Sequence, residues 1–383
     1  MTIRMSFIES IENIELSHYK WIAHIEKLTR LAKGKDVFPV TVELDLVSYC
    51  NHGCEWCVDP IHKHDTLDLS FVSELLNEFK ILGIEGIVFK GGGEPTLYHL
   101  FADVIKEAKS LGFEVGIVTN GSKLEELYES IVQNASYLRV SIDGPTYESH
   151  RRIHKSNDFE SIIKGVDKTV KLRNKLQKRH PIIGLSFAMD YSSVNLVGDA
   201  IGLGVKLNTN YVLLRPPFFD EVARKNTMTI DQKIDVLSVF EKKCDSYNGN
   251  MKILIDYWIS DSETNALHSR DESPRRGKYI QQGANGLEHI TCRCFASPLL
   301  AVVTADRKVY PCCNLRFIED WNLGVIDYGK NNNFEKIWKS QKRKEIIDKI
   351  HMVKCIKYCT HPLSRYNEVI EYLRSKQFHK GFV

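Results

Sequence analysis

The sequence predicts an α/β fold in which a partial (β/α)6 barrel, similar to a TIM barrel, is followed by a small C-terminal domain. Two observations predict this fold class. Short apolar segments alternate with helical patterns through residues 40–216, which is typical of βαβ units around a parallel sheet. After residue 216 the alternation stops, and six cysteines gather between residues 292 and 359.

The elements of the predicted barrel can be taken in chain order. Before it, residues 6–33 carry apolar side chains at three- and four-residue spacing, which predicts a helix that Gly34 ends. Six strands are expected at Val40–Leu46, Gly86–Lys90, Glu114–Thr119, Tyr137–Ile142, Ile182–Met189 and Asn210–Leu214. Helices are expected between them at Asp68–Leu82, Tyr98–Leu111, Lys123–Gln133, Phe159–Lys178 and Val194–Leu203. Parallel barrels gather their functional residues at the carboxyl ends of the strands, so motifs at these ends are the candidates.

The C-terminal part follows a different pattern. A helix is expected at Ile230–Ser246, then a short apolar run at Lys252–Ile259, then a polar stretch over residues 260–288. A polar connection of this length is either a lid over the barrel mouth or a spacer. Farther on, the sequence predicts a hairpin and an amphipathic helix, at Leu299–Tyr310 and Phe334–Ile350.

These patterns divide the chain into five parts. We expect an N-terminal helical extension, the barrel, a connecting segment with a lid, a cysteine-rich domain and a C-terminal tail, at residues 1–39, 40–216, 217–290, 291–362 and 363–383.

The composition excludes several classes of protein. With 383 residues, 43% hydrophobic and 26% charged, the chain has an ordinary globular composition and can bury a full core. A net charge of +3 falls short of that of a dedicated nucleic-acid binder, so the basic runs at 171–180 and 341–344 are expected to be solvated helix faces. No apolar stretch is long enough for a signal peptide core or a membrane span, so we expect no membrane partner and a cytoplasmic location.

Three cysteines on one loop are the central feature of the sequence. Cys50, Cys54 and Cys57 follow the first strand, with three and then two residues between them. Three thiolates so close in sequence can bind one metal centre, and soft thiolates select iron-sulfur clusters, zinc or copper(I). A working site keeps one coordination position open, whereas a zinc knuckle would recruit His52, His62 or His64 as the fourth ligand.

The Cys-x3-Cys-x2-Cys spacing, with Trp56 before the last cysteine, resembles the cluster loop of the radical S-adenosylmethionine (radical SAM) enzymes. In that family three cysteines hold a [4Fe-4S] cluster, and S-adenosylmethionine chelates the fourth iron. One electron then cleaves this cofactor to a 5′-deoxyadenosyl radical, which abstracts hydrogen from a substrate. The resemblance implies Cys50, Cys54 and Cys57 as metal ligands, and a flavodoxin- or ferredoxin-type protein as electron donor.

A glycine-rich segment, Lys90–Thr96, ends the second strand. Glycines let the backbone approach a ligand closely, and Glu94 supplies an acceptor. A lone glycine triplet is more often a tight turn, but this one follows the cysteine loop by one βα unit. Radical SAM enzymes carry a similar segment at this place, and the resemblance implies that Gly92, Gly93 and Glu94 bind the cofactor methionine.

The next two strands end in polar residues. The third ends in Thr119 and Asn120, and the fourth in Ser141 and Asp143. The resemblance implies that Thr119, Asn120 and Ser141 contact the ribose and the carboxylate of the cofactor. Asn-Gly and Asp-Gly are also common turn dipeptides, so for Asp143 a ligand contact and a turn remain open.

Other cofactor contacts are less well matched. Members of the family often carry His-Asp-x-x-Arg after the fourth strand, but this chain reads HRRIH at residues 150–154. The arginine is displaced, and Arg152 is the candidate partner of the cofactor carboxylate. Asn195, with Arg215, lies where the family places adenine or carboxylate contacts. On the fifth strand only one of Ser186 and Met189 can point into the barrel.

The C-terminal cysteines resemble a second kind of site. A cysteine, a hairpin, a cysteine, a helix containing Trp338 and a close cysteine pair resemble the auxiliary-cluster domains called SPASM in the long form and twitch in the short form. Six cysteines suit one auxiliary [4Fe-4S] cluster. The resemblance implies Cys294, Cys312, Cys355 and Cys359 as its ligands, with Cys292 and Cys313 as substitutes. A zinc ribbon is the alternative, because zinc accepts the same thiolates.

The resemblance therefore implies a radical SAM enzyme. Related barrels with such an extension act on sugars, aminoglycosides or ribosomally made peptides, by oxidation, epimerisation or cross-linking. The first forty residues show no winged-helix module that would bind a leader peptide, so we expect a small polar, sugar- or aminoglycoside-like substrate, rather than a peptide, and an oxidation.

Two alternatives to this reading stay open. Cys244 lies outside both cysteine groups, and as a hydrogen donor it would favour an epimerase, although a free cysteine is more often a small buried hydrophobe. The alternative from another class is a non-catalytic protein in which the cysteines hold structural zinc.

Overall fold

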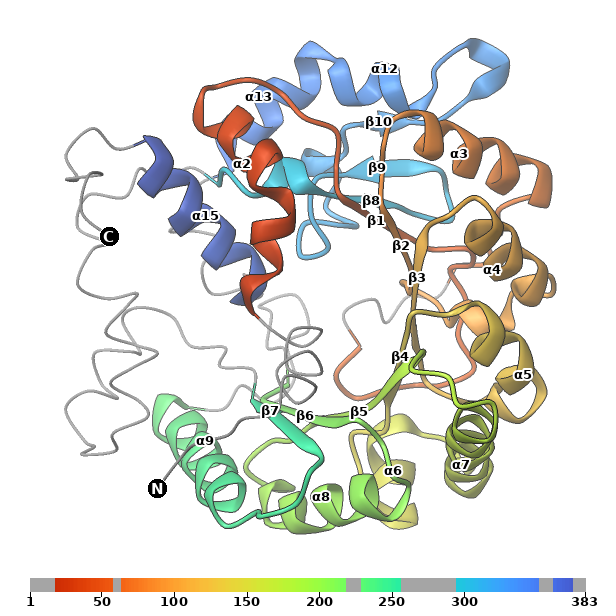
Figure 1. The fold of residues 1–383 in the computed structure, drawn as a ribbon, viewed down its shortest axis with the longest axis vertical. Helices are drawn as coiled ribbons and strands as arrows, with labels where there is room; N and C mark the ends of the chain where they lie inside the picture. The colour runs from red at the N-terminus through yellow and green to blue at the C-terminus, as the bar shows by residue number, and fades with distance from the viewer. Residues whose placement is uncertain (1–17, 58–62, 218–228, 256–293, 351–360, 375–383) are drawn as a thin grey trace.

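The computed structural model describes residues 18–57, 63–217, 229–255, 294–350 and 361–374. Its strands are β1 (Thr41–Leu44), β2 (Gly86–Phe89), β3 (Glu114–Thr119), β4 (Tyr137–Ser141), β5 (Ile182–Ala188), β6 (Tyr211–Arg215), β7 (Lys252–Ile255), β8 (Leu300–Val303), β9 (Lys308–Tyr310) and β10 (Gly324–Val325). They form one curved sheet in the order β10-β9-β8-β1-β2-β3-β4-β5-β6-β7 (Figure 1).

The strands from β8 through β1 to β7 are parallel to their neighbours. β9 pairs antiparallel with β8 on its other side, and β10 pairs antiparallel with β9. The helices of the barrel are α3 (Leu69–Ile81), α4 (Phe101–Ser110), α5 (Leu124–Asn134), α6 (Tyr147–His154), α7 (Phe159–Lys175), α8 (Val197–Lys206) and α9 (Ile230–Asp245). Most of them lie along the outer side of the sheet (Figure 1).

Alternation along the strands separates an apolar face from a polar one. Residues such as Val42, Ile87, Ile117 and Leu185 are buried together with the apolar side chains of the helices in one large core. Successive side chains point to opposite faces of a strand, so the residues between them face the inside of the barrel. Those inner residues include the polar side chains of Glu43, Arg139, Ser141, Ser186 and Arg215.

The predicted fold class is confirmed, because a parallel sheet with outer helices forms a partial barrel of the expected kind. All six expected strands are present, with ends within three residues of the expected ones. The alternation nevertheless continues beyond Pro216, since α9 and β7 add another helix and a strand parallel to β6. The helix α6 at residues 147–154, which carries the HRRIH segment, was not expected as a separate element.

The cysteine-rich part joins the barrel through its sheet. β8 pairs in parallel with β1, and β9 completes the expected hairpin by pairing antiparallel with β8. One sheet thus runs through the barrel and the C-terminal part, while the expected domain division itself stays a prediction. The expected helix at Phe334–Ile350 is two helices, α12 (Phe334–Lys339) and α13 (Gln341–Lys349). They separate at Ser340, which has extended backbone angles and accepts a hydrogen bond from the N–H of Arg343.

Side-chain contacts also fix the C-terminal part to the barrel. The Phe334 ring packs edge-on against Phe79 of α3, with the ring centroids 4.9 Å apart. The Glu78 carboxylate accepts hydrogen bonds from the N–H groups that begin α12, which also suits the positive end of a helix dipole. Trp338 donates from its ring nitrogen to the Val37 carbonyl at 2.9 Å. The auxiliary part is therefore positioned firmly on the amino-terminal half of the sheet.

The chain before β1 is helical where the structure describes it, as η1 (His18–His24) and α2 (Ile25–Ala32). The rest of the expected helix at residues 6–33 lies outside the described residues. Leu28 and Leu31 of α2 share a small core with Ile370 of α15 (His361–Arg374). Within the described ranges, no helix has the length and apolar character needed to cross a bilayer.

Candidate functional site

The three cysteines lie on the loop that follows β1, and each side chain is partly exposed. The loop lies against the last turn of α6. The N–H of Gly53 donates to the His154 carbonyl at 3.0 Å, and that of Glu55 donates to the Ile153 carbonyl at 2.8 Å. The cysteine loop is therefore held by a helix that lies about one hundred residues later in the sequence.

Burial and the neighbouring negative charges disfavour the thiolate forms of Cys50 and Cys54. Burial raises the pKa of Cys50 to about 11, with smaller contributions from Glu94 and Cys57. Burial also raises the pKa of Cys54 far above its usual range, and Asp143, Cys50 and Cys57 add to the effect. Neighbouring thiolates repel each other, so these cysteines need a bound cation to ionise together. A soft metal centre supplies that positive charge.

The Glu94 carboxylate accepts four hydrogen bonds within the protein. Its Oε1 accepts hydrogen bonds from the N–H and hydroxyl of Thr96 and from the Thr119 hydroxyl, and its Oε2 accepts from the N–H of Asn120 at 2.7 Å. Only 3% of Glu94 is exposed. The carboxylate therefore joins the ends of β2 and β3, and three of the residues expected to bind the cofactor, Glu94, Thr119 and Asn120, come together.

Close packing explains two of the glycines in this segment. A Cβ on Gly93 would lie 2.3 Å from the Tyr49 carbonyl oxygen, and one on Gly91 would lie 2.9 Å from the Asp45 carboxyl group. The N–H of Glu94 also donates to the Tyr49 carbonyl at 2.9 Å. The glycines thus seat the segment directly against the chain that leads into the cysteine loop.

Asn120 connects the end of β3 to the cysteine loop. Its side-chain amide donates to Asn51 Oδ1 at 2.9 Å and lies 3.9 Å from Cys50 Sγ. Ser141 lies opposite Ser186 in the β4–β5 register. Ser186 is fully buried, and its hydroxyl has no hydrogen-bond partner among the described residues. Ser186 and the Ser141 position therefore offer polar groups to the inside of the barrel, while Met189 belongs to the outer core.

Asp143 forms the turn that was left open for it, while its contact with the cofactor or substrate stays a prediction. Its backbone has a positive φ of 54°, a left-handed conformation that Asp adopts more readily than most residues. Its Oδ1 accepts a hydrogen bond from the N–H of Ala188 at 2.8 Å, and its Oδ2 lies 3.1 Å from His154 Nε2. Asp143 is thus a turn residue whose carboxylate also orients a buried histidine.

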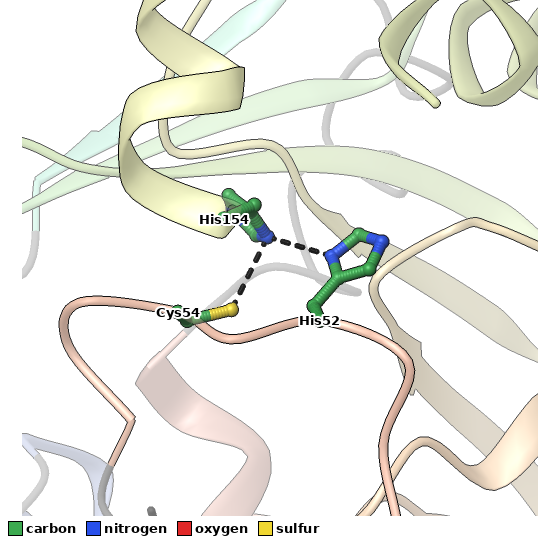
Figure 2. A group of neighbouring side chains, drawn as sticks. All are labelled: His52, Cys54 and His154. Carbon is green, nitrogen blue, oxygen red and sulfur yellow. Dashed lines mark hydrogen bonds between the residues drawn. The ribbon is translucent and has the colours of Figure 1, made fainter. Parts of the chain in front are cut away.

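Sequence reasoning missed that histidine and two others as a group. His52, His150 and His154 are almost fully buried, and His52 Nδ1 lies 3.0 Å from His154 Nδ1. His154 Nδ1 also lies 3.3 Å from Cys54 Sγ (Figure 2). The four-residue spacing of His150 and His154 signals one shared face of a helix, but it is informative only once α6 is recognised as a helix.

The structure does not bring every expected residue to this place. Arg152 is about half exposed and pairs with Glu55 of the cysteine loop at 3.8 Å. Asn195 is exposed in the short helix η3 (Val194–Leu196). Cys244 lies on α9, where its partly buried side chain packs against the main core. The expectation of a polar lid at residues 260–288 falls outside the described residues.

Three of the C-terminal cysteines are described, and Cys292, Cys355 and Cys359 lie outside the described residues. Cys294 and Cys312 share a small buried cluster, and Asn367 donates from its amide to Cys294 Sγ at 3.6 Å. The neighbouring thiols of Cys312 and Cys313 are hydrogen-bonded to each other, which raises the pKa of Cys312 and lowers that of Cys313. The pKa of Cys313 also responds to the charges of Glu43, Lys90 and Arg316.

Arg316 links this cysteine segment to the glycine-rich segment. Its Nη2 donates to the Gly91 carbonyl at 3.2 Å, and its Nη1 lies 3.5 Å from Asp45 Oδ1. Asp45 in turn accepts a hydrogen bond from the N–H of Gly92 at 3.3 Å. The first auxiliary cysteines therefore approach the same strand ends as the cysteine loop.

The donor set fits a [4Fe-4S] cluster with one iron left for a further ligand. Three partly exposed cysteines on one loop can supply three of four ligands, and a buried carboxylate, Glu94, lies beside that loop. A rival donor set also exists, because His52 Nδ1, His154 Nδ1 and Cys54 Sγ lie within 4.8 Å of one another. Two imidazoles and a thiolate would suit zinc.

Two family models match the chain. Residues 45–184 match the model of the radical SAM superfamily, and residues 294–361 match SPASM, an iron-sulfur cluster-binding domain. The first match contains the cysteine loop, the glycine-rich segment and the three histidines. The second contains all the C-terminal cysteines except Cys292.

Curated relatives are similar over part of their length. An S-adenosylmethionine-dependent nucleotide dehydratase of Selenomonas ruminantium is 23% identical over 46% of this chain and 66% of that protein. A GTP 3′,8-cyclase of Haemophilus ducreyi is 28% identical over 37% of this chain and 44% of that protein. The chain thus spans less than two thirds of the length of these relatives.

Solved structures share the fold at low sequence identity. SuiB of Streptococcus suis, bound to the precursor peptide SuiA, aligns with a TM-score of 0.63 and 11% identity, over 86% of this chain and 71% of that chain. The enzyme anSMEcpe with bound AdoMet aligns with a TM-score of 0.57 and 18% identity, over 81% of this chain and 82% of that chain.

Proposed function

Because the chain belongs to the radical SAM superfamily and carries a C-terminal SPASM domain, we propose that it is an enzyme that abstracts hydrogen from a small polar substrate and oxidises that substrate. The two domains imply S-adenosylmethionine, a [4Fe-4S] cluster and auxiliary iron-sulfur binding as its cofactor chemistry. When bound, these cofactors supply the radical that removes a substrate hydrogen atom. The protein contributes binding, orientation and the exclusion of competing hydrogen donors.

Cys50, Cys54 and Cys57 are the proposed ligands of the first cluster. Glu94, Thr119 and Asn120 form the proposed binding surface for S-adenosylmethionine, together with Gly92, Gly93 and Ser141. The hydrogen bonds from Thr119 and Asn120 to the Glu94 carboxylate support this proposal, because they fix an anionic group beside the cysteine loop. An ammonium group of a ligand is then met by a charge that is already oriented.

The inner face of the barrel supports a small polar substrate. Arg139, Ser186 and Arg215 lie on this face, and the Ser186 hydroxyl and Arg139 Nε have no hydrogen-bond partner among the described residues. Buried polar groups of this kind are normally satisfied, so they suit the hydroxyl or anionic groups of a bound sugar. The similarity to a nucleotide dehydratase and a GTP cyclase agrees with a substrate that contains a sugar.

One observation carries the proposal of oxidation, namely the approach of the Cys312–Cys313 segment to the strand ends. Arg316 contacts both the Gly91 carbonyl and Asp45. The pKa of Cys313 is affected by the charges of Glu43, on β1, and of Lys90, just after β2. A cluster held by Cys294, Cys312, Cys355 and Cys359 would then be near enough to accept the electron that a substrate radical loses. Flavodoxin or ferredoxin is the proposed donor of the initiating electron.

Anaerobic purification tests this proposal. We expect brown protein, about eight irons and eight sulfides per chain for two four-iron clusters, and 5′-deoxyadenosine that forms only with a reductant. Colourless protein with stoichiometric zinc would overturn the assignment of an enzyme and favour the structural zinc protein.

A further inference from the structure

A network of three histidines and two aspartates connects the cysteine loop to α6. His52, His150 and His154 are 3%, 0% and 1% exposed, and their ring nitrogens meet the carboxylates of Asp143 and Asp158. Figure 2 shows how His154, at the end of α6, points toward both His52 and Cys54 of the loop. The network is therefore in direct contact with a proposed cluster ligand.

Carboxylates fix the proton positions at the outer nitrogens, Nε2, of His52 and His154. His52 Nε2 lies 2.8 Å from Asp158 Oδ2, and His154 Nε2 lies 3.1 Å from Asp143 Oδ2. Burial alone would raise the pKa of each aspartate, but hydrogen bonds, including those of the histidines, hold the pKa of both below the usual range. Each of these nitrogens therefore faces an ionised carboxylate and donates an N–H to it.

The inner nitrogens, Nδ1, of His52 and His154 face each other. His52 Nδ1 and His154 Nδ1 lie 3.0 Å apart, and two lone pairs would repel at that distance, so one of these two nitrogens carries a proton. Cys54 Sγ lies 3.3 Å from His154 Nδ1. A proton on His154 Nδ1 would therefore face two acceptors, His52 Nδ1 and the Cys54 sulfur. It would make the ring an imidazolium: burial lowers the pKa of His154, whereas the Asp143 carboxylate favours the charged ring.

We propose that His154 donates an Nδ1–H hydrogen bond to the Cys54 sulfur and that this bond raises the reduction potential of the cluster held by Cys50, Cys54 and Cys57. The inference rests on the proposed function, because it needs that cluster. A donor to a ligand sulfur stabilises the reduced cluster, which carries the greater negative charge. His154 acts here as a positioning residue that touches a ligand, rather than as a residue that touches the substrate.

The local structure holds His154 in the geometry that this hydrogen bond needs. Asp143 fixes the outer nitrogen of the ring, and the ring of His150 stacks on it with centroids 4.4 Å apart. Lys155, in a left-handed conformation, ends α6 directly after His154. The end of α6 then accepts the N–H groups of Gly53 and Glu55, so one helix end positions both the backbone of the loop and a cysteine sulfur.

A zinc ion on the same three atoms fits the distances less well. Zinc-nitrogen bonds of about 2.0–2.1 Å in a tetrahedral site put two nitrogens about 3.3 Å apart. The observed separation of 3.0 Å between the two Nδ1 atoms is instead that of an N–H···N hydrogen bond. The fixed Nε2 atoms and the short distance between the Nδ1 atoms therefore favour a protonated Nδ1 over a bound zinc ion.

The test compares three variants of the reconstituted holoenzyme. His154→Leu removes the donor, His154→Gln keeps an amide N–H, and His150→Phe keeps the stacked ring without any contact to a cysteine sulfur. The midpoint potential of the cluster whose electron paramagnetic resonance (EPR) signal changes with S-adenosylmethionine is measured by redox titration. We expect His154→Leu to lower the reduced-to-oxidised ratio at a fixed potential about tenfold or more, the size of a hydrogen bond to a charged group. We expect His154→Gln to recover part of this loss and His150→Phe to match the wild type.

A second measurement needs no variant. In wild-type protein labelled with ¹⁵N-histidine, the reduced cluster should show a weak ¹⁵N coupling and an exchangeable proton coupling that disappears in deuterium oxide. Absence of both couplings, or an unchanged potential in His154→Leu with its cluster intact, would overturn the inference. The proposed function would survive either result, because the iron content and the EPR response to S-adenosylmethionine report on it separately.

Discussion

The backbone N–H of Asn120 donates to the Glu94 carboxylate at 2.7 Å, and this hydrogen bond ties the end of β3 to the end of β2. The same carboxylate accepts hydrogen bonds from Thr96 and Thr119. Much of the hydrogen-bonding capacity of Glu94 is therefore used within the protein. A bound ammonium group would add its charge to a carboxylate that the scaffold already orients.

We expect Glu94→Gln to weaken S-adenosylmethionine binding about tenfold or more, because a charge-assisted hydrogen bond becomes a neutral one. The amide NH₂ of glutamine would also face N–H and O–H donors, and this should cost about 1–3 kcal/mol in the free energy of unfolding. Calorimetric titration and thermal unfolding measure the two effects. Glu107→Gln, which alters a carboxylate bonded to Ser73 in the helix layer, is the matched control. Unchanged affinity in Glu94→Gln would remove the residue from the binding site.

Replacing Cys50, Cys54 and Cys57 together by alanine should abolish cleavage of S-adenosylmethionine. It should leave about four irons per chain, because a four-iron auxiliary cluster has ligands of its own. Cys294 and Cys312 belong to a separate buried cluster beside Leu315 and Ile347, so the change should not disturb them. Iron and sulfide analysis with EPR spectroscopy makes the measurement. Loss of all iron would contradict the two-cluster model.

Asp45 should make the stability of the protein depend on pH. Burial raises the pKa of Asp45 to about 6, although Arg316 and the N–H of Gly92 lower it. The folded state therefore binds this proton more tightly than the unfolded state. The resulting stabilisation is fully present below pH 4 and is lost as the pH rises through 6.

In Asp45→Asn no buried carboxyl group at this position has to ionise in the folded state as the pH rises. We expect the variant to be more stable than the wild type above pH 7, by about 3 kcal/mol for a pKa shift of this size. The difference should shrink steadily as the pH falls toward 4. Denaturant unfolding of both proteins at several pH values tests this, and a difference that stays constant with pH would show that Asp45 is not the titrating group.

Arg316 should couple the auxiliary part to cofactor binding. Arg316→Leu removes the donor to the Gly91 carbonyl and the partner of Asp45, so the glycine-rich segment loses its support. We expect weaker S-adenosylmethionine binding with the iron content unchanged. Arg307→Leu, which breaks an exposed ion pair with Asp68, is the control and should bind normally, since such surface pairs contribute little. Equal affinities in the two variants would separate Arg316 from the binding site.

Much of this architecture could be predicted, because it follows from local patterns. The alternation of apolar runs and helical patterns predicted the strands, and the glycines and Glu94 were expected beside the cysteine loop. The strand β7 (Lys252–Ile255) was recognised only as an apolar run, since its place in the sheet depends on pairing with β6. Likewise, the pairing of β8 with β1 joins residues about 260 positions apart, which no local pattern reports.

The histidine network shows where sequence reasoning stops. His52 was considered only as a zinc ligand, and the HRRIH segment only for its displaced arginine. Their meeting depends on α6 lying against the cysteine loop and on Asp143 and Asp158 pointing inward. These are tertiary contacts over about one hundred residues, and spacing alone cannot predict them.

The fate of the substrate radical provides the last prediction. A radical that loses an electron gives an oxidised product, whereas one that takes a hydrogen atom from a cysteine gives an epimer. Cys244 is the candidate donor, but it lies on α9 with its side chain packed against the main core. This position supports the role of a small buried hydrophobe, so we expect Cys244→Ala to retain turnover and to lose about 1 kcal/mol of stability.

Turnover in deuterium oxide distinguishes the two outcomes. A cysteine exchanges its S–H proton with solvent, so an epimerase would place one deuterium on the product carbon and would lose this ability in Cys244→Ala. We expect instead a product lighter by two hydrogens, without deuterium on carbon, from both the wild type and the variant. Mass spectrometry of the product makes the measurement. Deuterium incorporation that depends on Cys244 would replace oxidation by epimerisation and would require α9 to bring its cysteine to the substrate.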